Sequence, residues 1–245
     1  MKKENTIRRL VDFSQLNRLV EMHKEIFMNT VLQDKLIYFD ENFPHYLKTV
    51  LLDKNQYIFG VFTDNEINGF LHFKKYNESL FLNNIFIGEK IRGRGIGTEV
   101  LNTVLRYPFV MDEGMIFLEL DVLQSNSGAK KWYEKLGLSE VSKDIWYFIN
   151  NPRIDRDLNP HFEIATDDNN FNSLFYNKEK VATIINDFYI IVHNKLALEY
   201  PSIKTFVYKE MARDESIQYP VVDCSIRMKG TISQIIDKLG CLHLK

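Results

Sequence analysis

The feature that most constrains this chain is a glycine-rich loop, Arg92-Gly93-Arg94-Gly95-Ile96-Gly97, between a predicted strand and a predicted helix. The first turn of a helix has backbone N–H groups without intrahelical acceptors, and these point along the positive end of the helix dipole. A pyrophosphate placed there receives several hydrogen bonds. Glycines keep the backbone open to such a ligand, and the two arginines add positive charge. The alternative interpretation is a flexible basic turn that binds nothing.

The spacing of the glycines argues against two other phosphate-binding loops. A Walker A loop ends in Gly-Lys-Ser/Thr, whereas Gly97 is followed directly by Thr98. The dinucleotide fingerprint G-x-G-x-x-G, counted from Gly93, also places Thr98 where its third glycine should be. Asp112 and Glu113 do lie where a ribose-binding acid would sit, about 20 residues further on. An NAD(P)-binding oxidoreductase therefore stays a weaker alternative.

The surrounding pattern predicts an α+β fold with a mixed, mostly antiparallel sheet flanked by helices. Strand 115–123 shows the alternation most clearly, because Leu118 and Leu120 point to one side and Glu119 and Asp121 to the other. Pro108 is expected to end the helix that follows the glycine loop. Helices are predicted at 14–30, 44–52 and 126–136, and a further helix over Val100, Leu101, Val104 and Leu105 after the glycine loop. Strands are predicted at 6–11, 56–62, 67–76, 80–87, 115–123 and 141–149.

The later part of the chain predicts a second, smaller α+β domain. Residues 150–160 are polar with two prolines and are interpreted as a linker, which separates a first domain at 1–149 from a second at 161–245. The second domain is expected to contain a hairpin formed by 174–176 and 180–192, and a final helix that begins at Thr231. The sequence shows no internal repeat.

Composition excludes several classes of protein. The 245 residues carry 31 Lys and Arg against 33 Asp and Glu, and this net charge of −2 argues against nucleic-acid binding. No apolar run approaches the roughly 18–20 residues of a membrane span, and the start lacks the apolar segment of a signal peptide. Cys224 and Cys241 are too few for a disulfide framework or a zinc site. We expect a cytoplasmic protein without a metal.

Two segments together resemble the GNAT superfamily of acetyl-CoA-dependent N-acetyltransferases. Arg92-x-x-Gly95-x-Gly97 is similar to the family's pyrophosphate loop, R/Q-x-x-G-x-G/A. About 30 residues further on, the chain is similar to the family segment N-x-x-A-x-x-x-Y-x-K-x-G-F, with Leu138 in place of the commoner phenylalanine. The resemblance covers about residues 6–149. That second segment reads Asn126-Ser127-Gly128-Ala129-Lys130-Lys131-Trp132-Tyr133-Glu134-Lys135-Leu136-Gly137-Leu138.

The resemblance implies how acetyl-CoA would bind. The backbone of about 94–98 would hold the pyrophosphate, with Arg92 at the family's Arg/Gln position. The strand edge at 85–87 would pair with the pantetheine arm. Asn126 would contact the cofactor near its reacting end, and Tyr133 would lie beside the sulfur. The implied cofactor-binding residues are Ile85, Phe86, Ile87, Arg92, Gly93, Arg94, Gly95, Ile96, Gly97, Thr98, Asn126 and Tyr133.

Acetyl transfer from a thioester to an amine requires two proton transfers, and the sequence offers candidates for both. Tyr133 suits protonation of the departing thiolate, although a tyrosine in an apolar helical stripe is often a core residue. Asp121 or Glu119 suits relay of the amine proton through water, although both also fit a solvent-facing strand. Backbone amides near Phe86 would polarise the thioester carbonyl. Further candidates on the preceding strand are Glu78, Asn83 and Asn84.

We therefore expect an N-acetyltransferase that moves an acetyl group from acetyl-CoA to a primary amine by direct attack in a ternary complex. The alternative is a non-catalytic CoA-binding sensor or scaffold. The expected partners are acetyl-CoA and a small-molecule or peptide amine. Three roles stay open for residues 161–245: a wall of the acceptor site, a degenerate duplicate of the first domain, or a dimerisation unit that would make a homodimer.

Overall fold

The computed structural model describes residues 5–111, 114–150, 159–211 and 219–242. The predicted linker at 150–160 therefore falls largely outside the described residues. The chain forms two compact units, and both are discontinuous along the sequence. Unit 1 comprises Met1–Ile26, Val50–Ser142 and Ile226–Lys245, and unit 2 comprises Phe27–Thr49 and Lys143–Ser225.

Unit 1 is built on an antiparallel meander followed by one parallel strand. Between its second and third strands the chain turns at Asp64 and Asn65, whose φ values of 52° and 66° are left-handed, as a tight hairpin requires. The fifth strand lies parallel to the fourth. The predicted α+β class with a mixed, mostly antiparallel sheet is confirmed. The strands are β1 (Asn5–Leu10), β2 (Gln56–Thr63), β3 (Glu66–Tyr76), β4 (Ser79–Ile87) and β5 (Phe117–Leu123).

Four helices pack against this sheet around one apolar core. Val100, Leu101 and Leu239 lie in this core and have no exposed surface. The prediction for Pro108 was wrong: the preceding helix already ends at Leu105, and Pro108 begins the next one, because proline fits the first turn of a helix. The helices are α3 (Ile96–Leu105), α4 (Pro108–Met111), α5 (Ser127–Lys135) and α6 (Ile232–Leu242).

The N-terminal helices connect the two units along the chain. Helix α1 (Leu16–Phe27) buries Leu19 and Met22 completely in unit 1. The chain then enters unit 2, which holds the 3₁₀ helix η1 (Ile37–Phe39) and most of α2 (Phe43–Leu52).

A β-bulge in β4 ends its pairing with β5. The register between β3 and β4 shifts by one residue at Asn83. The parallel pairing of β4 with β5 reaches Leu82 and Leu120 and stops there, while β4 continues beside β3 to Ile87. In the described part of unit 1, the edge of 83–87 on the β5 side is therefore left without a strand partner.

Unit 2 repeats this strand order. Four strands form an antiparallel meander, and the fifth lies parallel to the fourth. The hairpin predicted from 174–176 and 180–192 is present, but its second segment is divided by a further turn at Asn186 and Asp187, whose φ values are 45° and 59°. Only the 3₁₀ helix η2 (Lys195–Glu199) connects the last two strands. These strands are β7 (Phe162–Thr166), β8 (Asn172–Tyr176), β9 (Glu179–Ile185), β10 (Tyr189–Val192) and β11 (Thr205–Met211).

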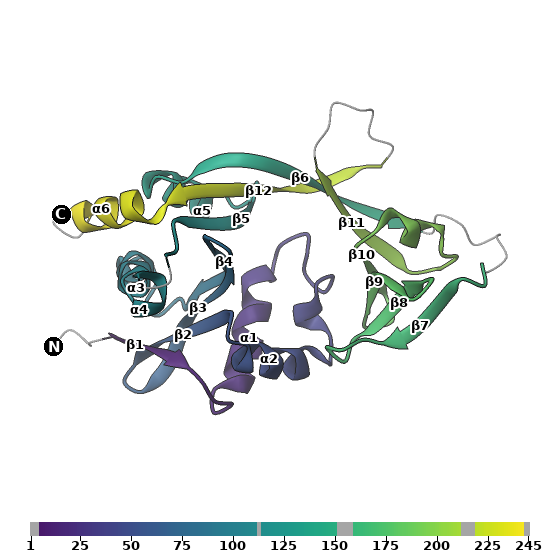
Figure 1. Ribbon diagram of the computed structural model, residues 1–245, viewed down its shortest axis with the longest axis horizontal. Coiled ribbons are helices and arrows are strands. Elements are labelled where there is room, and N and C mark those ends of the chain that lie inside the picture. The colour runs from purple at the N-terminus through teal and green to yellow at the C-terminus, as the bar shows by residue number, and fades with distance from the viewer. Residues whose placement is uncertain (1–4, 112–113, 151–158, 212–218, 243–245) are drawn as a thin grey trace. The chain divides into compact units, whose positions relative to one another are not determined.

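Each unit takes the next strand of its sheet from the other half of the chain. In unit 1 the neighbour of β5 is β12 (Val221–Thr231), which Figure 1 shows in yellow next to the teal β5. In unit 2 the neighbour of β11 is β6 (Ser139–Asn150). The topology is therefore an internal repeat with an exchanged strand, although the sequence shows no repeat.

The exchange changes which residues complete the first core. The sequence assigns all of 161–245 to a second domain, but the structure places the part from Ile226 onward in unit 1. Ile226, Met228 and Ile235 are buried in the core of unit 1. Their burial, together with the pairing of β12 beside β5, is the physical reason for the different division.

Candidate functional site

The glycine loop lies between β4 and α3, and its backbone requires glycine. Gly93 and Gly95 have φ values of 77° and 78°, in the left-handed region that other residues avoid. A Cβ atom added at either position would meet no atom within 4 Å. A residue other than glycine would therefore be strained at these two positions. The backbone there is also open to an approaching ligand.

The loop ends at the N-terminus of α3. Gly95 is the N-cap of α3, and the first backbone hydrogen bond of the helix runs from the N–H of Glu99 to the carbonyl of Gly95 over 3.0 Å. The N–H groups of Ile96, Gly97 and Thr98 consequently have no intrahelical acceptor. Together with the helix dipole, they form a site for an anion.

The two arginines of the loop lie differently. Arg94 is exposed in the loop itself. Arg92 turns back to β4: its Nε donates to the carbonyl oxygen of Ile87 over 2.9 Å, and its guanidinium lies 5.9 Å from the ring centre of Phe86. In this structure the side chain of Arg92 therefore holds the end of β4.

Helix α5 brings the second sequence segment to the glycine loop. Asn126 caps this helix by accepting a hydrogen bond from the N–H of Ala129 over 3.2 Å. Trp132 reaches the start of α3, where its indole Nε1 donates to the hydroxyl of Thr98 over 3.3 Å. Its ring also lies 3.7 Å from the position of a Cβ on Gly97. The two segments are thus in contact.

Tyr133 follows Trp132 and is directed into the core. Its side chain is 5% exposed and lies in the apolar cluster of unit 1. Burial raises the pKa of the Tyr133 phenol well above its ordinary value. The hydroxyl therefore stays protonated at neutral pH and is available as a proton donor.

Residues 85–87 form the free end of β4. They still pair with β3, and the bulge at Asn83 reverses which side of the sheet each side chain faces. Ile85 and Ile87 pack against the same core as α3, whereas Phe86 is 6% exposed outside that cluster. The strand edge that faced β5 before the bulge is available for an extended ligand.

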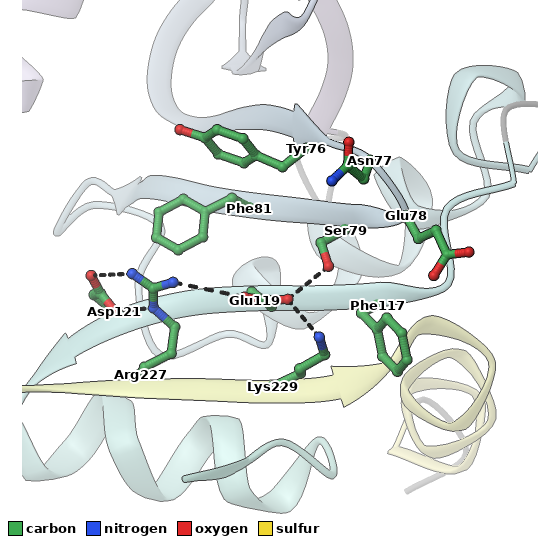
Figure 2. Close-up of a pocket in the computed structure, with 10 residues that line it drawn as sticks. All are labelled: Tyr76, Asn77, Glu78, Ser79, Phe81, Phe117, Glu119, Asp121, Arg227 and Lys229. Carbon is green, nitrogen blue, oxygen red and sulfur yellow. Dashed lines mark hydrogen bonds and ion pairs between the residues drawn. The ribbon is translucent and has the colours of Figure 1, made fainter. Parts of the chain in front are cut away.

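A pocket of about 850 Å³ opens on unit 1 beside the strands that diverge. Its aromatic lining comes from the end of β3, β4 and β5, and its polar floor comes from β5 and β12. Figure 2 shows the side chains of Glu119, Asp121, Arg227 and Lys229 meeting on this floor. The lining residues are Tyr76, Asn77, Glu78, Ser79, Phe81, Phe117, Glu119, Asp121, Arg227 and Lys229.

Both predicted carboxylates are held in ion pairs. Asp121 accepts from Nε and Nη2 of Arg227 over 2.5 and 3.1 Å. One oxygen of Glu119 accepts from the Ser79 hydroxyl over 2.7 Å and lies 2.8 Å from Nζ of Lys229. Burial alone would raise the pKa of Glu119, but the hydrogen bonds from Lys229 and Ser79 outweigh it and lower the pKa below its ordinary value.

The sequence did not suggest Arg227 or Lys229 as site residues. Arg227 is 106 positions from Asp121 along the chain, and only the exchange of β12 brings the two together. The alternation of apolar residues around Ile226 and Met228 indicates a strand but does not name its neighbour. Glu78, a further candidate, is exposed at the rim of the pocket.

A buried polar chain lies beneath the bulge. Gln56 donates from Nε2 to Asp53 over 2.9 Å, so its Oε1 faces His72, whose Nε2 donates to it over 2.9 Å. Burial lowers the pKa of His72 to about 3 and that of His23, on α1, to about 4. Asn84, another candidate, is 6% exposed in this region.

The remaining expectations concern the two cysteines, a ribose-binding acid, a metal site and a membrane span. Cys224 is a buried free cysteine, while the side chain of Cys241 and both Asp112 and Glu113 lie outside the described residues. Within the described ranges, no group of three His, Cys, Asp or Glu side chains could hold a metal ion. None of the described helices combines the length and apolarity needed to cross a membrane.

Comparison with known proteins places this geometry in context. The model of the Acetyltransferase (GNAT) family matches residues 16–138. No curated protein matches the sequence.

Solved structures of low sequence identity share the fold over almost the whole chain. A tandem GNAT protein from the clavulanic acid biosynthesis pathway has a TM-score of 0.65 at 10% identity, covering 94% of this chain and 99% of that one. A GCN5-related N-acetyltransferase from Sphaerobacter thermophilus has a TM-score of 0.59 at 10% identity, covering 93% and 96%. A spermidine N-acetyltransferase mutant from Vibrio cholerae has a TM-score of 0.51 at 12% identity, covering 96% and 97%.

Proposed function

This chain belongs to the GNAT acetyltransferase family, and we propose that it transfers the acetyl group of acetyl-CoA to a primary amine by direct attack in a ternary complex. The observation that carries the proposal is the open glycine loop at the N-terminus of α3, beside the free edge of β4. The two features would hold the two ends of one extended, phosphate-bearing substrate.

The loop would bind the pyrophosphate through its backbone. N–H groups of 94–98 would donate to the phosphate oxygens, and Gly93 and Gly95 leave room for this approach because no atom lies within 4 Å of an added Cβ. Arg94 would add charge from its exposed position. The Arg92 side chain would act through the strand, by fixing the carbonyl of Ile87.

The free edge of 85–87 would pair with the pantetheine arm as an added strand. Backbone amides near Phe86 would donate to the thioester carbonyl and stabilise the charge that develops there. Acetyl-CoA supplies the activated acetyl group. Asn126 would contact acetyl-CoA near the reacting end. Its side-chain oxygen caps α5, so its side-chain nitrogen would make this contact.

Tyr133 would act as the general acid. When the amine attacks the carbonyl carbon and the carbon–sulfur bond breaks, the departing thiolate needs a proton. The buried phenol is protonated because its pKa is raised, and a phenol can donate to a thiolate. Its position directly after Trp132, which contacts the pyrophosphate loop, supports this role.

Asp121 or Glu119 would relay the proton that the amine loses, through water. Both carboxylates are held in ion pairs, and a carboxylate can accept a proton. Asp121 is favoured, because it directly follows Leu120, where the pairing of β4 with β5 ends. The ion pair with Lys229 and the lowered pKa make Glu119 the weaker base.

For the second half of the chain, we favour the interpretation as a degenerate duplicate. Unit 2 has the strand order of unit 1, including the parallel pair. However, residues 193–204, which connect β10 to β11, contain no glycine and only the short η2 helix. A second CoA site of the same kind is therefore not expected in unit 2.

The test is a thermal-shift measurement with acetyl-CoA, CoA and NAD, followed by an amine screen that detects free thiol. We expect stabilisation by acetyl-CoA and CoA, and thiol release that depends on the amine. Binding of CoA without turnover on any amine would favour the sensor or scaffold. Stabilisation by NAD alone would overturn both interpretations.

A further inference from the structure

The floor of the unit 1 pocket has its carboxylate oxygens engaged. Both oxygens of Asp121 accept hydrogen bonds from Arg227. One oxygen of Glu119 accepts from both Ser79 and Lys229, and the other lies 3.7 Å from Nη1 of Arg227. A ligand that enters this pocket therefore finds both carboxylates of the floor already paired with cations.

Lys229 differs from these carboxylates because its ammonium group has more N–H donors than hydrogen-bond partners. An ammonium group has three N–H donors, and among the described residues Lys229 has one carboxylate partner, Glu119. Its Nζ also lies 4.0 Å from the ring centre of Phe117, and its side chain is 34% exposed toward the pocket. Figure 2 shows it on the pocket floor between Glu119 and Phe117. The four charges of the floor balance, and Lys229 presents its unused hydrogen-bond donors to a ligand.

The two ends of the pocket lie at different distances from the place where the acetyl group would be transferred. The acetyl group would be transferred where β4 and β5 part, next to Leu82 and Leu120. Asp121 lies at that end, whereas Lys229 contacts Glu119, two residues further back along β5. Two residues of strand span about 7 Å. An acceptor with its amine at the reacting end therefore brings a group about 7 Å away next to Lys229.

We propose that the acceptor is an amine whose other end carries a carboxylate or a similar anionic group, held by Lys229. This rests on the proposed acetyl transfer and adds the substrate class. Aromatic side chains of Tyr76, Phe81 and Phe117 line the same pocket and suit an apolar linker between the two ends. Glu78 is exposed at the rim, where solvent screens its charge.

A polyamine is the competing class, and the floor disfavours it. A second ammonium group about 7 Å from the first would lie beside Lys229 and near Arg227, with Glu119 already neutralised by both. Like charges at that distance repel, whereas an anionic group gains a charge-assisted hydrogen bond. The two classes are therefore separated by the charge of one terminal group.

The experiment uses four acceptors with the same six-carbon chain. They are 6-aminohexanoate, 6-aminohexanamide, 1,6-diaminohexane and hexylamine, each assayed with acetyl-CoA and the full-length chain. We expect kcat/KM for 6-aminohexanoate to exceed that for 6-aminohexanamide by about tenfold, as one charged hydrogen bond allows. In Lys229→Met this ratio should fall close to one, and in Lys229→Arg it should persist.

Matched controls separate the possible outcomes. Lys54→Met removes an exposed lysine of unit 1 outside the pocket and should keep the wild-type ratio. Turnover that prefers 1,6-diaminohexane, or a ratio that Lys229→Met leaves unchanged, would overturn the anionic acceptor but not the acetyl transfer. If neither these four amines nor any other amine caused release of thiol, the proposed function itself would be rejected.

Discussion

The indole Nε1 of Trp132 donates a hydrogen bond to the hydroxyl of Thr98 over 3.3 Å. Thr98 lies in the first turn of α3, whose N–H groups would bind the pyrophosphate, and Trp132 directly precedes Tyr133, the proposed acid. Trp132 therefore connects the two parts of the proposed site. It touches neither reacting atom, so it is a positioning residue.

Trp132→Phe should weaken acetyl-CoA binding about 2- to 10-fold, the range expected for one hydrogen bond. Thr98→Val removes the same hydrogen bond from the other side and should give a similar loss. Calorimetric titration with acetyl-CoA measures both. Because each variant loses the same contact, the double variant should bind no more weakly than the weaker single one, and additive losses would contradict the link.

Gly97→Glu should abolish detectable acetyl-CoA binding. The new carboxylate would lie at the helix N-terminus where the phosphates bind, and losing even one charge-assisted hydrogen bond costs about 1.5–3 kcal/mol, or at least about tenfold in affinity. Gly97→Ala is the matched control. Its Cβ would meet Trp132 at 3.7 Å, an ordinary contact, so this variant should fold and keep most of its affinity. Unchanged affinity in Gly97→Glu would show that the phosphates bind elsewhere.

Tyr133→Phe should lower kcat by about 100-fold or more, the usual contribution of a general acid, with little effect on the KM for acetyl-CoA. Because burial raises the pKa of this phenol, loss of its proton should cause no fall in kcat between about pH 7 and 9. Stopped-assay rates across this pH range test both statements. Full turnover by Tyr133→Phe on a verified substrate would assign Tyr133 to the core alone.

A chain that ends at Asn150 should lack a cooperative unfolding transition. It would lose β12 and α6, which bury Ile226, Met228 and Leu239 in the core of unit 1. Near-UV circular dichroism during heating tests this. In the full chain, the milder change Leu239→Ala should lower the free energy of unfolding by about 2–5 kcal/mol. A truncated chain that melts like the full-length protein would contradict the role of the exchanged strand.

Acid should destabilise the fold through its buried histidines. The pKa of His72 is about 3 and that of His23 about 4 in the folded chain, below the value of about 6.5 in an unfolded chain. As the pH falls below about 6.5, the unfolded chain binds protons that the folded chain excludes. The free energy of unfolding should then drop by about 1.4 kcal/mol per pH unit for each histidine.

Urea titrations between pH 7 and 5 measure this slope. His72→Gln should make it shallower by about one proton, whatever its effect on stability at pH 7. His45→Gln, at an exposed position of α2, serves as the control and should keep the wild-type slope. An equal slope in His72→Gln and the wild type would exclude His72 as a source of the acid sensitivity.

Much of unit 1 could be predicted from sequence because its signals are local. The turn at Asp64 and Asn65, the glycine loop and the alternation of 117–123 each depend on neighbours within a few residues. In unit 2 a similar local signal lies inside the predicted segment 180–192: Asn186-Asp187 is a turn pair, and it divides this segment into β9 and β10.

The floor of the pocket could not be predicted in the same way. Its cations, Arg227 and Lys229, meet Asp121 and Glu119 only because β12 lies beside β5. An alternating strand fits the edge of any sheet that has a matching apolar face, so β12 alone does not identify its neighbour. The exchange of strands is a property of the whole chain, and no local pattern encodes it.

Because of the strand exchange, we expect the protein to become active late in its synthesis. Chains usually fold domain by domain as they leave the ribosome, with N-terminal domains first. Here a nascent chain that has emerged as far as Asn150 contains the glycine loop and Tyr133 but not the neighbour of β5. Unit 1 closes only after the last strand and helix have been translated. We therefore expect acetyl transfer only after β12 and α6 have been translated, and no activity in a fragment that ends before β12.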